Sequence, residues 1–515
     1  MTLEPEIFWS TDGRSSCSWN RLNPAPSKNL GFEETASYAF LKPSGNWLFY
    51  VDDEPLRDDP TNPSCWAWHP GFYAGEVTAE AVECDGPRRA LFLLDVAPDR
   101  NKLGRDVFAD MIREILDADP ALVVGTEPAS VRAGALGTID NAWVAFSRLR
   151  RYVPDFLKAF SEIRERPRVA LRVSRESVAL HRVRSVDRQT ISSARRNRSV
   201  AALLGDAEDL SIVGPDVQVD VPRIAETTDS AANRTLLALV LALSMRTKTV
   251  IERVRDLTER EERSDTRTPL VTRWPRRHEF LDHLAGRLRQ ITHDRLFREV
   301  ERPEISAAGL TAISADALYS RAWSRGWLAL RPGIASKSAV ERLWISPSWE
   351  IYERWCFIRL GKMLATAMPE WNWHLLRERW VGSFDGSVSE LMLQPTFRSW
   401  RGTPKGRWSI SKQREPDLVL LATRNSVTRF LVLDAKYRTS RTSVLDAMES
   451  AHVYQDSLRI GSQRPHGSIL LVPRGAGAGW LENVDFQMEH RVGVAPFSPG
   501  TDNDIPLLAK QVLAI

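Results

Sequence analysis

Two aspartates and a lysine in the C-terminal part of the chain have the types and spacing of residues that could surround a divalent metal ion. In the expected strand TRFLVLDAKYR, alternate side chains share a face, so Asp434 and Lys436 project together, about 7 Å apart. Residues 423–428 supply the preceding turn, and a hairpin folded about its centre pairs Asp417 with Asp434. Two facing carboxylates repel each other unless a cation lies between them. The spacing therefore predicts a divalent metal site.

A third carboxylate is expected on the helix that precedes these strands. In SWEIYERWCFIRLGKML, helical spacing places Glu353 in the middle of an apolar face. An unpaired carboxylate is costly to bury, so Glu353 needs a positive partner. The residues leave two partners open, which are the metal ion and a buried arginine such as Arg354 or Arg359.

The elements that must position these residues follow one another as helix, three strands, helix and strand. After the helix around Glu353 come the strands VSELMLQPTF, EPDLVLLA and TRFLVLDAKYR, the helix SVLDAMESAHVYQDSLR and the strand GSILLVP. A mixed sheet flanked by helices is the economical fold for this α-β-β-β-α-β order. We assign this domain to residues 336–515.

The rest of the chain divides into two further regions by its apolar spacing. Residues 1–125 show strands and turns with one amphipathic helix around Asp106 to Asp117, whereas residues 126–335 show helical spacing. We therefore predict a multidomain α/β and α+β protein with a β-rich N-terminal domain, a helical targeting and assembly region, and the C-terminal domain. The charge-rich stretch Glu259–Arg277 is expected to be an exposed connection.

The composition is that of a folded multidomain protein. The 515 residues are 43% hydrophobic and 26% charged. The longest purely apolar run, Leu236–Leu243, is far shorter than the roughly 20 residues of a membrane-spanning helix, so no membrane partner is expected. The start MTLEPEIFWS lacks the basic and apolar parts of a secretory signal, and we expect a cytoplasmic protein. The chain has no GxxxxGK[ST] phosphate loop, so any nucleotide-driven motor must be another polypeptide.

A strongly basic strip lies in the middle of the chain. Eleven arginines and three acidic residues between Arg164 and Arg198 give a local net charge of +8. Such a strip suits a polyanion, and we assign Arg195 and Arg196 to nucleic-acid contacts. The alternative is that these arginines form a solvated face or pair with acids elsewhere in the chain.

The carboxylate and lysine motifs resemble the PD-(D/E)xK nuclease signature. Pro416-Asp417 opens one strand, Asp434-Ala435-Lys436 closes the next, and the preceding helix carries Glu353. The stretches YERW, PDLVLL, VLDAKYR and HVYQDSL also resemble a bacterial family with an N-terminal domain of unknown function and a restriction-endonuclease-like C-terminal domain similar to McrC, the nuclease subunit of modification-dependent restriction.

The resemblance implies a metal-dependent DNA endonuclease of a prokaryotic defence or restriction system, working with a separate McrB-like AAA+ NTPase. Asp417, Asp434 and the carbonyl of Ala435 would bind Mg²⁺ or Mn²⁺, with Glu353 completing the shell or binding through water. Lys436 would orient and help deprotonate the attacking water, or neutralise charge in the transition state. This agrees with the preference of hard cations for oxygen ligands and with their effect on bound water.

The helix after the Asp-x-Lys strand departs from the pattern of related nucleases, which often carry Gln-x-x-x-Tyr. With Tyr454 in the tyrosine position, Ser450 occupies the glutamine position and Gln455 follows one residue after the tyrosine. We assign His452, Tyr454 and Gln455, together with Arg438, to DNA-phosphate contacts or to support of the metal ligands. The alternative is that they are ordinary polar residues beside a half-buried helix.

A different class of function is a non-catalytic adaptor that binds nucleic acid and stimulates a partner motor. It would use the basic strip and the nuclease-like fold, and its activity would be indifferent to Asp434→Ala. The sequence leaves open whether the nucleic acid is DNA or RNA, and whether the protein forms a homo-oligomer.

Overall fold

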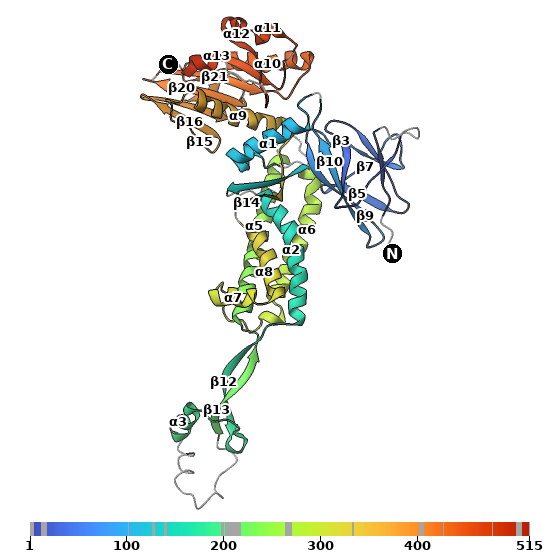
Figure 1. Cartoon of the computed structure of the whole chain (residues 1–515), viewed down its shortest axis with the longest axis vertical. Helices are drawn as coiled ribbons and strands as arrows, with labels where there is room; N and C mark the ends of the chain where they lie inside the picture. The colour runs from blue at the N-terminus through green and yellow to red at the C-terminus, as the bar shows by residue number, and fades with distance from the viewer. Residues whose placement is uncertain are drawn as a thin grey trace, which may run out of the picture. The chain divides into compact units, whose positions relative to one another are not determined.

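The structure is a computed structural model of the whole chain (Figure 1). It describes residues 5–11, 18–100, 102–125, 129–137, 142–196, 200, 218–262, 270–331, 334–400, 406–425, 427–475, 477–500 and 507–513. Its internal contacts group the chain into two compact units. The first combines residues 1–147, 254–278 and 332–515, and the second combines residues 148–253 and 279–331. The predicted boundaries after residues 125 and 335 mark changes in the spacing of apolar residues along the sequence. The two units are defined by contacts in space, and the first unit contains both ends of the chain.

The N-terminal part of the first unit is built mainly from strands. One sheet has the order β2-β1-β4-β8-β7, and the other has the order β14-β11-β9-β10-β3, with β5 on β9 and β6 on β5. Strand β14 pairs with β11, although some 200 residues of sequence separate them. The bounds are β1 Phe8–Ser10, β2 Asn20–Arg21, β3 Lys28–Glu33, β4 Tyr38–Leu41, β5 Trp47–Val51, β6 Glu54–Pro55, β7 Arg57–Asp58, β8 Cys65–Trp68, β9 Gly75–Glu83, β10 Arg89–Ala97, β11 Ala129–Gly137 and β14 Ile334–Trp344.

Aromatic side chains fill the core between these strands. The Phe32 ring lies 4.4 Å from that of Trp9 and 5.0 Å from that of Tyr38, measured between centroids. Helix α1 (Arg105–Ala118) follows the strands, and it confirms the helix predicted around Asp106 to Asp117.

The C-terminal part of the first unit contains a seven-stranded sheet in the order β15-β16-β17-β20-β21-β23-β24. Pairing is antiparallel from β15 to β21 and parallel from β21 to β24, so the predicted mixed sheet is present. The predicted elements are α9 (Ser348–Ala367), β17 (Ser387–Leu393), β20 (Leu418–Arg424), β21 (Val427–Ala435), α10 (Arg441–Ser457) and β23 (Gly467–Val472). The additional elements are β15 His374–Leu376, β16 Arg379–Phe384, β18 Arg398–Ser399, β19 Arg407–Ser409, β22 Leu458–Ile460, α11 Gly479–Glu482, α12 Val484–His490, β24 Val492–Pro496 and α13 Leu507–Leu513.

Helices α9 and α10 cover opposite faces of this sheet (Figure 1). The strand periodicity explains the arrangement, because successive side chains of β21 point to opposite faces. Leu431 and Leu433 belong to the core that includes α9, whereas Phe430 and Val432 belong to a cluster with Tyr454 of α10. By the same alternation, Asp434 lies on the α10 face.

The second unit is mainly helical. Its helices are α2 (Ala142–Glu165), α5 (Ala231–Glu262), α6 (Leu270–Thr292), α7 (Ala307–Ser314) and α8 (Ala317–Leu330). The start of α2, the end of α5 and the start of α6 belong to the first unit. Helix α8 packs closely on α5, because a Cβ atom at Gly326 would lie 2.6 Å from Cδ2 of Leu239. A ribbon of β12 (Ala170–Ala179) and β13 (Gln218–Thr227) leads from these helices to α3 (Arg188–Arg196) (Figure 1).

The stretch expected to be an exposed connection is partly buried, so that expectation is wrong for its second half. Helix α6 begins at Leu270, and the side chains of Arg273 and Arg277 are buried. Arg277 lies 2.8 Å from Asp52 and 3.2 Å from Asp53, both in the N-terminal strand region. Charge-rich sequence therefore became interior here because carboxylates from a distant loop neutralise the arginines. Residues 263–269 lie outside the described part.

No described helix combines the length and the apolar character needed to cross a membrane.

Candidate active site

The hairpin of β20 and β21 brings Asp417 and Asp434 together. The ladder pairs Leu418 with Leu433 and Val419 with Val432, and Asp417 directly precedes β20. This register is the one that the turn residues predicted, so the predicted pairing of the strands is confirmed. Oδ2 of Asp417 accepts a hydrogen bond of 2.8 Å from the backbone N–H of Ala435. That bond fixes one carboxylate against the backbone that follows the other.

Asp434 is fully buried, and its two oxygens have different surroundings. Oδ2 accepts a hydrogen bond of 2.6 Å from the Ser450 hydroxyl and lies 2.8 Å from Nζ of Lys436. Oδ1 has no hydrogen-bond partner within the described part of the chain. An unpaired buried oxygen is energetically costly, so this atom is the one available to a cation.

Lys436 lies between the two aspartates. Its Nζ atom is also 3.6 Å from Oδ2 of Asp417. Burial alone would lower the pKa of Lys436, but the carboxylates of Asp417 and Asp434 outweigh burial and raise that pKa. Burial, followed by the charges of Asp434 and Glu353, raises the pKa of Asp417. The lysine is therefore held as a cation among carboxylates that repel one another.

Glu353 is buried on α9, as its position on the apolar face predicted. Burial, followed by the charge of Glu350, raises the pKa of Glu353 to about 8. A hydrogen bond from the Gln394 side chain acts in the opposite direction, and Oε1 of Glu353 has no hydrogen-bond partner in the described structure. At neutral pH, Glu353 is therefore largely protonated unless a positive charge comes close to it.

The two arginines considered as partners of Glu353 are only partly buried and contact other acids. Arg354 forms an ion pair with Glu350, and Arg359 lies 3.6 Å from Glu114. The positive charge of Arg354 still lowers the pKa of Glu353, without offsetting its burial. The sequence left two partners open for Glu353, and the structure does not show an ion pair between Glu353 and either of these arginines.

The carboxylate oxygens at this site are the type of ligand that a hard divalent cation prefers, but only some of them are positioned to share one ion. Asp434 and Glu353 each present a buried, unpaired carboxylate oxygen. Among the described residues, however, no group of three or more His, Cys, Asp or Glu side chains is placed to hold a metal ion. The candidate ligands are Asp417, Asp434 and the Ala435 carbonyl, and the charge of Glu353 acts on Asp417 by raising its pKa.

Of the other candidate residues described on α10 and just before it, only Tyr454 shows an electrostatic link to the two aspartates. Burial, followed by the charges of Asp434 and Asp417, raises the pKa of Tyr454, which puts this residue within electrostatic reach of the site. Nε2 of Gln455 instead donates to the carbonyl of Pro465 at 3.2 Å, and His452 is exposed. Arg438 is also exposed and donates to a main-chain carbonyl of α10.

The basic strip belongs to the second unit, and the structure divides its arginines into two groups. Four of them lie 2.7 to 4.0 Å from carboxylates, namely Arg164, Arg168, Arg172 and Arg175. The alternative of pairing with acids therefore holds for these four. Arg195 and Arg196 are exposed on α3, and Arg198 lies outside the described residues.

Sequence reasoning did not assign roles to two residues that touch the candidate ligands. Ser450 donates to Asp434, and Gln394 contacts Glu353 through its side chain and the carbonyl of Asp417 through its backbone N–H, at 2.7 Å. The position of Ser450 in the usual glutamine slot was a usable signal. No signal in the sequence pointed to Gln394, because its contacts depend on a left-handed backbone conformation, with φ of 45°, directly after β17.

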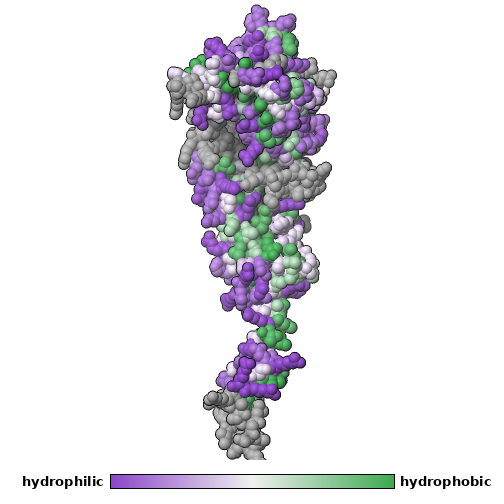
Figure 2. Space-filling model, turned by 90° about the vertical axis from the view of Figure 1, so that its left-hand side faces the viewer, coloured by the Kyte–Doolittle hydropathy of each residue, from purple (hydrophilic) through white to green (hydrophobic). Residues whose placement is uncertain are grey.

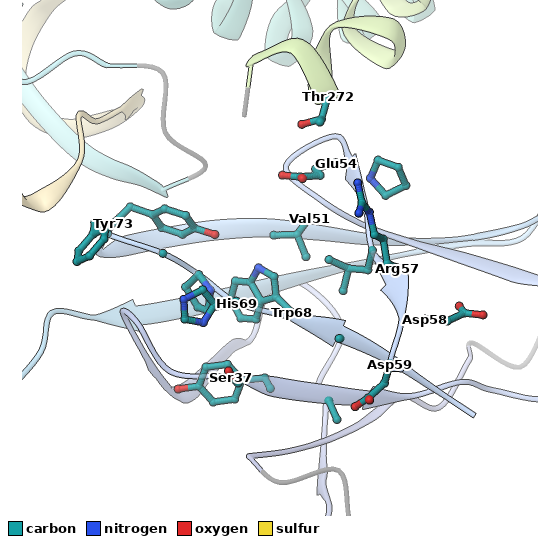
Figure 3. Close-up of a pocket in the computed structure, with 18 of the residues that line it drawn as sticks. Ser37, Val51, Glu54, Arg57, Asp58, Asp59, Trp68, His69, Tyr73 and Thr272 are labelled. Carbon is teal, nitrogen blue, oxygen red and sulfur yellow. The ribbon is translucent and has the colours of Figure 1, made fainter. Parts of the chain in front are cut away.

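The described part of the first unit includes a large cavity and a smaller one that bear on the search for a site. The larger, of about 1080 Å³, lies in the N-terminal strand region, where its lining includes Glu54, Trp68 and Tyr73 (Figure 3). The smaller, of about 530 Å³, is lined in part by Gln394. Only the smaller of these two therefore shares a residue with the candidate site.

No protein-family model, curated protein or solved structure matches this chain.

Proposed function

We propose that this protein is a metal-dependent DNA endonuclease of a prokaryotic defence or restriction system. Its reaction is hydrolysis of a phosphodiester bond, with Mg²⁺ or Mn²⁺ as the cofactor and a separate McrB-like AAA+ NTPase as a partner. Residues of the C-terminal sheet do the chemistry, and the rest of the chain serves in targeting and assembly.

One observation carries this proposal. The carboxylate of Asp434 is fully buried, with Oδ2 held by Lys436 and Ser450 and Oδ1 left unpaired among the described residues. A structural ion pair would gain nothing from an unpaired buried oxygen beside a second carboxylate, Asp417. A cation-binding role explains both the repulsion and the unpaired atom.

The residues have distinct tasks in the proposed reaction. When bound, the divalent ion lowers the pKa of water and stabilises charge on phosphate oxygens. Asp417 and Asp434 would hold the ion, and the Ala435 N–H keeps Asp417 in place. The Lys436 ammonium group orients the attacking water and offsets negative charge on the phosphate in the transition state. Ser450 fixes the direction of the Asp434 carboxylate.

A protein partner is supported by the surface of the second unit. Figure 2 shows hydrophobic side chains gathered at the level of its helices. Exposed large apolar side chains on these helices include Leu241 and Met245 of α5 and Trp327 of α8. Extended apolar surface on a folded protein is typical of an interface with another chain.

The test is plasmid cleavage by the purified full-length protein with Mg²⁺ or Mn²⁺, with and without the candidate NTPase partner. Lys436→Ala and Asp434→Ala are expected to abolish cleavage, whereas Lys412→Ala, which changes an exposed lysine of the same domain, leaves it intact. Equal cutting by Lys436→Ala and wild type overturns the catalytic assignment. A protein that binds DNA and stimulates a partner equally well with Asp434→Ala is the adaptor instead.

A further inference from the structure

A positively charged cavity lies beside the candidate active site, at the same end of the sheet. The pairing register shows this, because β16 pairs Arg379 with Met392, and β17 pairs Leu393 with Leu418 at the start of β20. Asp417 precedes Leu418, so Arg379 and Asp417 lie at the same end of the strands in this sheet. Two strand spacings of about 4.8 Å separate their strands, which amounts to about 10 Å.

Three arginines line this cavity, which has a volume of about 530 Å³. Arg398 of β18 and Arg407 of β19 are exposed and have no carboxylate partner within the described residues. Arg379 lies 3.9 Å from Glu390, and Glu378 is the one acidic residue in the described lining. The described lining therefore has a net charge of about +2. It lies at the same end of the strands as the carboxylates of Asp417 and Asp434.

Gln394 connects the cavity to the candidate site. It lines the cavity, its side chain contacts Glu353, and its backbone N–H donates to the carbonyl of Asp417. A ligand in the cavity would therefore contact the residue that touches the Glu353 carboxylate and the main chain of Asp417. Gln394 thus joins the lining of the cavity to the candidate site.

We propose that this arginine cavity binds a second phosphate of the DNA strand being cut, close to the phosphate that is hydrolysed. The inference rests on the proposed nuclease function and names a binding site for its substrate. Guanidinium groups present paired N–H donors that match phosphate oxygens. The separation of about 10 Å is short enough for both phosphates to belong to the same stretch of one strand. Placing a second phosphate there would set the scissile bond over the carboxylates.

The first experiment measures binding of the full-length protein to a fluorescent DNA duplex by anisotropy, at several salt concentrations. The double variant Arg398→Ala/Arg407→Ala is expected to bind about tenfold more weakly, because charged hydrogen bonds to the phosphate are removed. The slope of log affinity against log salt is expected to fall by about 0.9 for each phosphate that the variant no longer neutralises. In cleavage assays the same variant raises KM and leaves kcat close to wild type.

Arg424→Ala is the matched control, because Arg424 is an arginine at the opposite end of β20, paired with Asp385 at 2.8 Å. This variant is expected to retain both affinity and salt slope. A second probe replaces single phosphates of the duplex by neutral methylphosphonates. One position should weaken binding by wild type and have no further effect on the double variant.

The outcomes separate this proposal from the nuclease proposal. Wild-type affinity and slope in the double variant overturn the cavity assignment, even where cleavage is normal, and so does failure of the wild-type protein to bind the duplex. Cutting by Lys436→Ala overturns the nuclease, and the binding readout of the cavity stands independently of it. A loss of kcat at unchanged KM would place the arginines in the chemistry rather than in substrate binding, and would also overturn the assignment.

Discussion

Lys436 and Asp434 form an ion pair with 2.8 Å between Nζ and Oδ2, and this pairing leaves Oδ1 of Asp434 as the unpaired oxygen among the described residues. Ser450 donates to the same Oδ2. Because two donors hold one oxygen, the carboxylate cannot rotate freely, and the other oxygen keeps a fixed direction. The lysine and the serine thus prepare the aspartate for a cation before any cation binds.

Ser450→Ala should lower cleavage by about 10- to 100-fold, which is the usual effect of losing a partner that orients a metal ligand. The hydroxyl is small, and it lies on a helix whose packing does not depend on it, so the variant should fold normally. A metal titration of plasmid cleavage measures the effect as a higher Mg²⁺ requirement. Thr442→Ala, an exposed position on α10, serves as the control. An unchanged Mg²⁺ requirement would remove Ser450 from the site.

The metal requirement should depend on pH. The pKa of Asp417 is raised by burial and by its acidic neighbours, and that of Glu353 is raised to about 8. A cation competes with the protons on these groups, so its affinity rises as they ionise. The Mg²⁺ concentration for half-maximal cleavage should therefore fall between about pH 6 and pH 8, and fall less steeply in Glu353→Gln. A requirement that is constant over this range would contradict the assignment of these carboxylates.

Without divalent ions, Glu353 should make the folded state less stable as pH rises. Its folded-state pKa of about 8 lies above its ordinary value of 4.5. Between those values the unfolded chain releases its proton while the folded chain keeps it, so the free energy of unfolding falls by about 1.4 kcal/mol per pH unit at most. Below pH 4.5 and above pH 8 this group adds no further change. Urea denaturation in EDTA at several pH values measures the slope, and Glu353→Gln should remove this part of it. Identical slopes in both proteins would show that Glu353 ionises normally.

Arg277→Met should destabilise the first unit by about 3 to 5 kcal/mol, the usual cost of removing one partner from a buried charge pair. The guanidinium group contacts Asp52 and Asp53 and lies over the ring of Trp143, 5.1 Å from its centroid. Chemical denaturation provides the measurement. Arg89→Met removes an exposed arginine 3.8 Å from Glu80 and should cost under about 1 kcal/mol. Equal stability of the two variants would show that the buried contacts contribute little.

The local parts of the site could be predicted because they depend on short-range rules. A turn at residues 423–428 fixed the register of β20 and β21, and strand alternation placed Asp434 on a defined face. Helical periodicity placed Glu353 inside α9. The order of α9, β17, β20, β21, α10 and β23 followed from the same periodicities. Strands β15, β16 and β24 were not predicted, because their short segments carry weak alternation.

Contacts between distant segments were decided by the tertiary structure. Periodicity gives the face of a helix and not the sheet residue that it covers, so the sequence did not reveal that Ser450 meets Asp434, or that α9 and α10 lie on opposite faces of the sheet. The charge-rich start of α6 resembled a solvated segment, yet Asp52 and Asp53 made its burial tolerable. Burial of a charge depends on whether an opposite charge from elsewhere reaches it, and only the folded chain determines that distance.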